Sequence, residues 1–410
     1  MAKQNRTKTN EIVIPPGTKE IRDYAFNERD KMTSVVIPDS VTEIGECAFA
    51  GCTGLTSVVI PNSVTKIRRG AFSSCSSLTS VVIPDGVKEI GGGAFAGCTA
   101  LTSIVIPDSV TEIGGSAFAN CTSLTSVKIP HGVTEIKAET FSIGVRSSAW
   151  SVSFTNRSEA SFWGFNPPDP RDKERPCLPL VVDGGKYRSK YSSLTSVVIP
   201  DSVTEIGDGA FDGCTGLTSI VISGNVTKIG YEALSRCTGL TSIVIPGNVK
   251  EIGPLAFSRC TGLTSIEIPD DVKEIGPGAF AKCTSLTSVV IPKKVKAIKN
   301  ETFNGCTGLA SVVIPGNVKF IGYDAFAKCT GLTSVVIQKG VTSIESGAFA
   351  KCTSLTSVVF QNGGDGKPCM LEIRNYAFEG CTGLAEVEIP PNTQVAPDAF
   401  CTSTKRRRKE

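Results

Sequence analysis

Apolar and polar positions alternate in short segments that return every 23 residues along most of the chain. One such segment, from Leu55 to Pro61, reads LTSVVIP. Successive side chains of a β-strand point to opposite faces, so Val58 and Ile60 face one way and Val59 faces the other. Proline cannot donate a ladder hydrogen bond, so Pro61 ends the strand. The pattern predicts one short strand per period, parallel to its copies.

The rest of each period predicts a return segment with inward residues of its own. Val64 and Ile67 are expected to point inward, and the Ala-Phe pair at 71–72 is expected on a short helical turn that fills the interior. This pair, or a close substitute, recurs in nearly every period. Fifteen strand segments can be counted between residues 12 and 389. A single turn cannot bury its apolar face alone, so the turns are expected to stack as a solenoid.

Three features recur together: the LxxLxIP strand, the I-G-x-x-A-F step and a cysteine before the next leucine. In this combination the chain resembles the BspA-like (Treponema pallidum-type) leucine-rich repeat family, over residues 11–400 apart from one interruption. The resemblance implies a right-handed leucine-rich repeat solenoid with a parallel β-sheet on its concave face and short helical or 3-10 turns and loops opposite. It also implies a surface protein that adheres to host proteins and to other cells.

Departures from the period divide the chain into five parts. Residues 1–10 are a basic N-terminal segment, 11–141 a first block of repeats, 142–193 an irregular aromatic and Pro-rich insertion, 194–400 a second block, and 401–410 a basic tail. Insertions in repeat arrays emerge from one rim and often shape the binding face. Trp150, Trp163 and Phe165 of the insertion are therefore expected to contact a ligand as a flap. Alternatively these aromatic residues pack against the rim, and the two interpretations are compatible.

Twelve of the 16 cysteines stand three residues after the Phe or Leu that fills each turn. They are at positions 52, 75, 98, 121, 214, 237, 260, 283, 306, 329, 352 and 381. Equivalent residues on adjacent turns lie about 4.8 Å apart with parallel side chains, whereas a disulfide needs converging Cβ atoms about 3.8 Å apart. The spacing also lacks the close ligand pairs of zinc sites. The pattern predicts buried free thiols that fill a tight corner.

The outward position of the strand holds valine in 12 of the 15 segments. We call ten of these residues the valine stripe: Val36, Val59, Val82, Val105, Val198, Val221, Val244, Val290, Val313 and Val336. An apolar stripe of this kind is uncommon on a monomer unless something covers it, so it is expected to bind a protein ligand. The alternative is structural, because β-branched residues favour strands and duplication copies them. Lys128, Glu267 and Glu388 interrupt the pattern.

The residues that carry chemistry elsewhere are sparse or scattered here. The single histidine, His131, excludes a histidine-dependent triad or a histidine metal cluster. The carboxylates recur once or twice per turn, as on a solvated face. The net charge is only +3, and basic residues gather at both ends and in residues 142–193. We therefore expect no enzyme, no catalytic residues, no cofactor, no metal, and no nucleic acid on the repeat array.

Location and partners are open to two interpretations. The beginning of the chain has no apolar run of signal-peptide length, and no stretch is long and apolar enough to span a bilayer, so the default is a soluble cytoplasmic protein. The resemblance indicates the cell surface instead. The first function hypothesis is accordingly a monomeric adhesion or ligand-binding protein. The alternative is an intracellular scaffold for protein–protein interactions, for which the KRRRK tail would be a short targeting patch.

Overall fold

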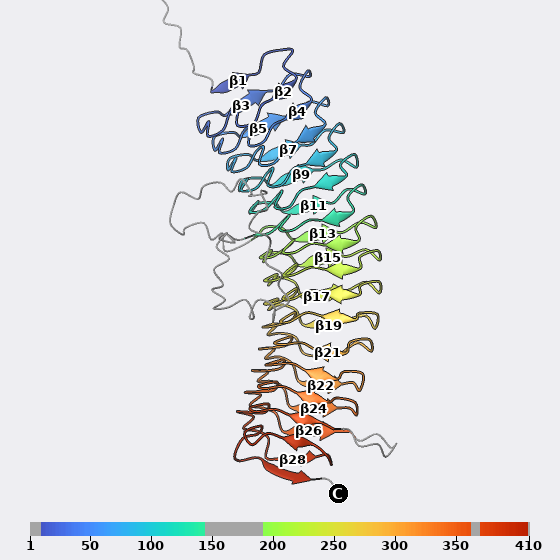
Figure 1. Cartoon of the computed structure of the whole chain (residues 1–410). Coiled ribbons are helices and arrows are strands. Elements are labelled where there is room, and N and C mark those ends of the chain that lie inside the picture. The colour runs from blue at the N-terminus through green and yellow to red at the C-terminus, as the bar shows by residue number, and fades with distance from the viewer. Residues whose placement is uncertain (1–9, 144–191, 362–369, 409–410) are drawn as a thin grey trace, which may run out of the picture. The chain divides into compact units, whose positions relative to one another are not determined.

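The computed structural model describes residues 10–143, 192–361 and 370–408. The chain divides into two compact units, residues 1–194 and residues 195–410. Each unit is a stack of parallel strands that repeat once per turn (Figure 1). The predicted β-solenoid of leucine-rich repeat type, with about 15 turns of about 23 residues, is confirmed.

In unit 1 the predicted strands form a parallel sheet, with one strand from each turn. The strands are β1 (Glu11–Val13), β3 (Ser34–Val36), β5 (Ser57–Val59), β7 (Ser80–Val82) and β9 (Ser103–Val105), and β11 (Ser126–Lys128) has the same position in the next turn. The register steps by 23 residues, so Val58 stands beside Val81, and Val59 beside Val82. Outward side chains of the sheet therefore have their counterparts directly beside them on the next turn.

A second parallel sheet in unit 1 was not expected from the sequence. Its two-residue strands are β2 (Glu20–Ile21), β4 (Glu43–Ile44), β6 (Lys66–Ile67), β8 (Glu89–Ile90) and β10 (Glu112–Ile113), and β12 (Glu135–Ile136) has the same position in the last turn. The isoleucine of each strand is buried and the charged residue lies outside. Two residues are too few to show alternation along the chain, so only pairing with neighbouring turns makes these segments strands.

Unit 2 repeats both sets of strands. The strands that correspond to the predicted ones are β13 (Ser196–Val198), β15 (Ser219–Val221), β17 (Ser242–Val244), β19 (Ser265–Glu267), β22 (Ser311–Ile314), β24 (Ser334–Ile337), β26 (Ser357–Phe360) and β28 (Glu386–Ile389). The second set comprises β14 (Glu205–Ile206), β16 (Lys228–Ile229), β18 (Glu251–Ile252), β20 (Glu274–Ile275), β21 (Ala297–Ile298), β23 (Phe320–Ile321), β25 (Ser343–Ile344), β27 (Glu372–Ile373) and β29 (Gln394–Val395). Between β19 and β22, Ser288 makes a single parallel bridge to Ser265.

The basic segment near the C-terminal end adds one more strand to unit 2. Residues Lys405–Arg408 form β30, which pairs in parallel with β28. Arg406 and Arg408 stand beside Val387 and Ile389, which are buried. These two strand positions hold buried apolar residues in most other turns, whereas in β30 they hold exposed arginines. Part of the expected tail therefore continues the sheet, and its charged surface covers the edge of β28.

The expected helical turn around each Ala-Phe pair is wrong, because the described residues contain no helix. The residue before the alanine and the residue before the ladder cysteine both have left-handed backbone, as in Cys47 (φ 50) and Gly51 (φ 71). Between them, alternate N–H groups donate to the next turn: Cys47 to the carbonyl of Arg69 at 2.9 Å, and Phe49 to that of Ala71 at 2.7 Å. These hydrogen bonds between turns replace those of a helix.

The interior is a column of stacked side chains. The phenylalanines of successive turns lie nearly parallel, with ring centroids 5.1 Å apart for Phe49 and Phe72 and 5.4 Å for Phe257 and Phe280. Leu234 takes the same position and is fully buried. Each ring inside a run of phenylalanines is therefore covered by the rings above and below it, which makes the stack continuous within each run.

Candidate functional site

The outward valines of unit 1 form an exposed row. Between 46% and 80% of the surface of Val36, Val59, Val82 and Val105 is accessible, whereas Val58 beside them in the chain is buried. The row is continuous because β3, β5, β7 and β9 pair in register, which brings these four valines side by side. The outward orientation expected for the valine stripe is therefore present in unit 1, and its role in binding stays a prediction.

Unit 2 carries the remaining residues of the valine stripe. Val198, Val221, Val244, Val290 and Val313 are exposed, and Val336 is half-buried. Glu267 stands beside Val244 in the pairing of β17 with β19, so a carboxylate interrupts the apolar row there. Lys128 ends the row in unit 1.

A row of threonine hydroxyls borders the valines. The Oγ1 atom of Thr56 donates a hydrogen bond to the carbonyl of Thr33 at 3.2 Å, Thr79 donates to Thr56 at 3.3 Å, and Thr102 donates to Thr79 at 3.2 Å. Each hydroxyl proton is therefore used within the ladder. The hydroxyl oxygens form a regular row along the valine stripe, and they can accept hydrogen bonds from a partner.

A hollow with a volume of about 590 Å³ lies at the Lys128 end of the row in unit 1. Its lining includes Val105, Lys128, Asp85 and Asp108. Asp108 accepts a hydrogen bond from the backbone N–H of His131 at 3.3 Å, and this contact and the imidazole hold the pKa of its carboxyl below the ordinary value. The hollow thus combines an exposed valine with two carboxylates.

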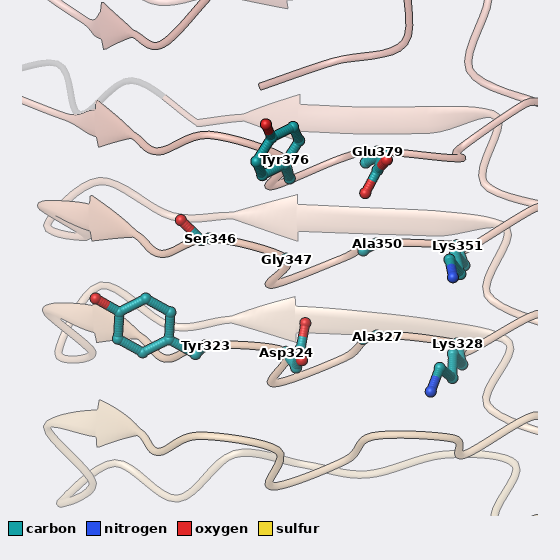
Figure 2. A pocket seen from close by; sticks show the side chains of 10 residues that line it. All are labelled: Tyr323, Asp324, Ala327, Lys328, Ser346, Gly347, Ala350, Lys351, Tyr376 and Glu379. Atoms are coloured by element: carbon teal, nitrogen blue, oxygen red, sulfur yellow. The ribbon is translucent and has the colours of Figure 1, made fainter. Parts of the chain in front are cut away.

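Another hollow lies in unit 2, away from the valines, and the sequence analysis missed it. Its volume is about 400 Å³. Figure 2 shows its lining side chains, which include Tyr323, Tyr376, Asp324, Lys328 and Lys351. The two tyrosines are 41% and 48% exposed. Tyr323 stands two positions before the alanine of its turn, as Tyr231 does, and Tyr376 stands directly before its alanine, as Tyr24 does. No single repeat position therefore marks the hollow in the sequence.

The ladder cysteines are buried as expected and form a second internal ladder. In the ladder cysteines other than Cys214, the thiol Sγ donates to the carbonyl of the interior residue of the preceding turn, as from Cys75 to Phe49 at 3.2 Å and from Cys260 to Leu234 at 3.1 Å. Burial raises the pKa of Cys121, Cys260 and Cys306 to about 12. The thiolate, which is the reactive form, is therefore strongly disfavoured along the ladder. Cys177 and Cys369 lie outside the described residues.

Other side chains of a type that can act in catalysis or ligand binding make structural contacts instead. Asp212, which is buried, accepts two hydrogen bonds from the guanidinium of Arg236, one of them from Nε at 3.0 Å. In the parts of the chain that the structure describes, no group of three or more His, Cys, Asp or Glu side chains could hold a metal ion. Those parts also contain no helix that is long and apolar enough to cross a membrane. Trp150, Trp163 and Phe165, the expected flap residues, lie outside the described residues.

The family follows from comparison of the repeats with known sequences. The model of the BspA type leucine-rich repeat region, which comprises six copies of the repeat, matches residues 6–145, 185–309 and 273–406. The chain belongs to the BspA type leucine-rich repeat family. The predicted resemblance is thereby confirmed, and no curated protein matches the chain significantly.

Several solved leucine-rich repeat structures are similar to the chain. A leucine-rich repeat protein from Bacteroides ovatus is 30% identical, with a TM-score of 0.78 over 98% of this chain and 92% of its own. A leucine-rich repeat protein from Eubacterium ventriosum is 23% identical, with a TM-score of 0.50 over 96% of this chain and 90% of its own. A leucine-rich cell surface protein from Faecalibacterium prausnitzii is 29% identical, with a TM-score of 0.47 over 87% and 88%. Members of this BspA-like class are typically repeat proteins for protein interaction.

Proposed function

We propose that this BspA-like protein is a non-enzymatic adhesion or ligand-binding protein whose outward valine face binds another protein. The observation that supports the proposal is the exposure of Val36, Val59, Val82 and Val105 in register on one parallel sheet. Apolar surface that is contiguous and held in place marks an interaction site more strongly than scattered exposed residues.

The valine face of unit 1 offers enough free energy for specific binding. Full burial of an exposed valine contributes about 1.5–3 kcal/mol. These valines are partly covered already, so a partner would gain about 1 kcal/mol from each, or about 4 kcal/mol from the four in unit 1. This corresponds to roughly a thousandfold in the dissociation constant. The sheet is ordered before binding, so little of this gain is offset by ordering of the surface.

The hollow beside Val105 indicates the chemistry of the partner. Asp85, Asp108 and Val105 all line it. The lining also contains Lys128, so the hollow presents both signs of charge. A partner segment that presents an apolar side chain, a lysine or arginine for a carboxylate and an acceptor for Lys128 would fill it. The partner is therefore a protein with an extended apolar segment and at least one basic residue near its end.

Crosslinking tests whether the valine face is the contact surface. A photoreactive amino acid replaces Val82 on intact cells that express the protein, and in a control it replaces Glu89 of the second sheet. We expect one crosslinked protein partner from position 82 and none from position 89. Equal crosslinking from both positions would contradict the proposal. Protease treatment of the same cells shows whether the complex is outside the cell, as adhesion requires, or inside, as a scaffold requires.

Binding to the captured partner then gives the energetic test. Threonine has the shape of valine and keeps its strand preference, so the triple variant Val59→Thr, Val82→Thr and Val105→Thr exchanges one methyl group for a hydroxyl at each position without changing the sheet. Three lost methyl groups weaken binding by about 2–3 kcal/mol, or roughly 30-fold to 150-fold, in titration calorimetry. The matched triple change to isoleucine retains binding. Unchanged affinity of the threonine variant would show that the valines do not carry the interaction.

A further inference from the structure

Unit 2 carries basic residues at a backbone position that favours glycine. The residue before each ladder cysteine has left-handed backbone, and glycine occupies this position at 51, 97, 213, 305 and 380. We call the basic residues at this position the basic row: Arg236, Arg259, Lys282, Lys328 and Lys351, with φ between 61° and 62°. A side chain in this conformation costs about 1–2 kcal/mol. The described turns of unit 1 have no lysine or arginine at this position.

The ladder between turns holds the basic row in place. The N–H of Arg259 donates to the carbonyl of Ala281 at 2.7 Å, and that of Lys328 donates to Ala350 at 2.7 Å. All five side chains are exposed. Successive turns are about 4.8 Å apart, so the cations form a line with one gap, at Gly305. The backbone of every member is fixed by the next turn, so the spacing of the row is set by the fold.

Four members of the basic row have their charge available. The guanidinium of Arg236 is paired with buried Asp212. In the described part of the chain, no carboxylate lies within ion-pair distance of the other four, which are Arg259, Lys282, Lys328 and Lys351. Lysines of the second set of strands differ in this respect, since Lys228, for example, forms an ion pair with Glu205 at 2.6 Å.

The hollow with two tyrosines opens beside the last two lysines of the basic row. Figure 2 shows Lys328 and Lys351 on consecutive turns at one side, with Asp324 and Gly347 farther in. The ring of Tyr323 lies beyond them, and Tyr376 stands on the following turn, level with Gly347. Gly347 has φ +70, and a Cβ there would come within 2.1 Å of Asp324 Oδ1. The absent side chain is what leaves space between the turns that carry the tyrosines.

We propose that the basic row and the tyrosine hollow bind an acidic polysaccharide, a sugar chain that bears carboxylates or sulfates. The cations of the basic row pair with acidic groups that recur along the sugar chain at the spacing of the turns. The tyrosine rings offer flat faces for sugar rings, and the carboxylates of Asp324 and Glu379 accept hydrogen bonds from sugar hydroxyls. An anionic membrane is a plane, and it would need a field of cations rather than a single row.

Glycine substitution tests the basic row without loss of the fold, because glycine is the residue of other turns at this position. The probe is a fluorescent heparin oligosaccharide, titrated at low and at physiological salt. We expect the wild-type chain to bind it with an affinity that falls as salt rises, and the triple variant Lys282→Gly, Lys328→Gly, Lys351→Gly to bind at least about tenfold more weakly. Circular dichroism confirms that the variant is folded.

The exposed basic strand β30 supplies the matched control. The triple variant Lys405→Gln, Arg406→Gln, Arg408→Gln removes the same number of positive charges and leaves Arg407, which pairs with Glu386 at 2.8 Å. This variant retains heparin binding if the basic row is the site. Loss of binding in this control, together with retention in the glycine variant, would overturn the proposal.

The tyrosines separate a sugar ligand from other polyanions. The double variant Tyr323→Ser, Tyr376→Ser keeps every positive charge, and we expect it to bind heparin several-fold more weakly while the salt dependence is unchanged. Neutral dextran should not bind. Tighter binding of a single-stranded oligonucleotide or of phosphatidylserine vesicles than of heparin would show that the row serves a different polyanion, which contradicts the proposal.

Discussion

The buried thiol ladder makes the stability of unit 2 sensitive to alkaline pH. The ordinary pKa of a cysteine is 9.0, and burial raises the pKa of Cys260 and Cys306 to about 12. A group whose pKa is higher in the folded protein contributes stability that is fully present below the unfolded pKa. That contribution is lost as pH rises from the unfolded pKa toward the folded one. The sensitive window for these two thiols is therefore pH 9 to about 12.

The size of the effect follows from the shift. At about pH 10.5 the unfolded thiol is ionised and the folded one is not, which costs about 2 kcal/mol per cysteine. Cys260 and Cys306 together remove about 4 kcal/mol. Burial also raises the pKa of Cys237 and Cys283, so the loss is larger still. The total stability of a folded domain is of order 5–15 kcal/mol, so unit 2 should approach unfolding within this window.

Urea denaturation followed by circular dichroism at a series of pH values measures this loss, and reaction with a thiol reagent reports when the cysteines become accessible. We expect the denaturation midpoint to fall steeply above pH 9 and the thiols to react only as structure is lost. The double variant Cys260→Ala, Cys306→Ala is the control for lysine and tyrosine titration. It should be less stable at neutral pH, because two hydrogen bonds and packing are lost, but should lose less stability between pH 8 and about 10.5. Equal pH dependence of the two proteins, or rapid reaction of the ladder thiols in the folded wild type near pH 8, would refute the reasoning; the half-exposed Cys401 is not part of this test.

Other predictions concern the interior column, a strained glycine and a buried ion pair. Phe303→Ala should lower the free energy of unfolding by about 3–5 kcal/mol, and Phe303→Leu by much less because Leu234 fills the same position; urea denaturation compares them. Gly340→Ala should cost more than about 1 kcal/mol, since φ is +120 and its Cβ would lie 2.2 Å from the carbonyl oxygen of Gly316; an unchanged melting temperature would contradict this. Asp212→Ala should cost about 1–3 kcal/mol by removing the acceptor of Arg236, and the double change Asp212→Ala, Arg236→Ala should cost less than the two single changes together.

Much of the interior could be predicted from local pattern. The inward Val58 and Ile60, the buried phenylalanines and the buried cysteines are all at the positions that the 23-residue period indicates. The valine face could be predicted too, because a strand has a period of two and leaves Val59 outside once Val58 is inside. The tyrosine hollow and the basic row were not found in this way. The basic row depends on what stands at one position of successive turns, and the hollow combines Tyr323 and Tyr376 from turns that are not adjacent in the sequence. Such residues are far apart along the chain and form no local pattern.

The sequence by itself determined the repeat, the residues that face inward and the family, because these depend on which side chains can share one interior. Only the tertiary structure decided the conformation of the return segment. The two-residue strand β6, formed by Lys66 and Ile67, has no local signal, and it exists because its neighbours at plus and minus 23 residues complete its ladder. The Ala-Phe segment likewise has too few local hydrogen bonds to be stable alone. It takes left-handed residues instead of a helix because its N–H groups find carbonyls on the next turn.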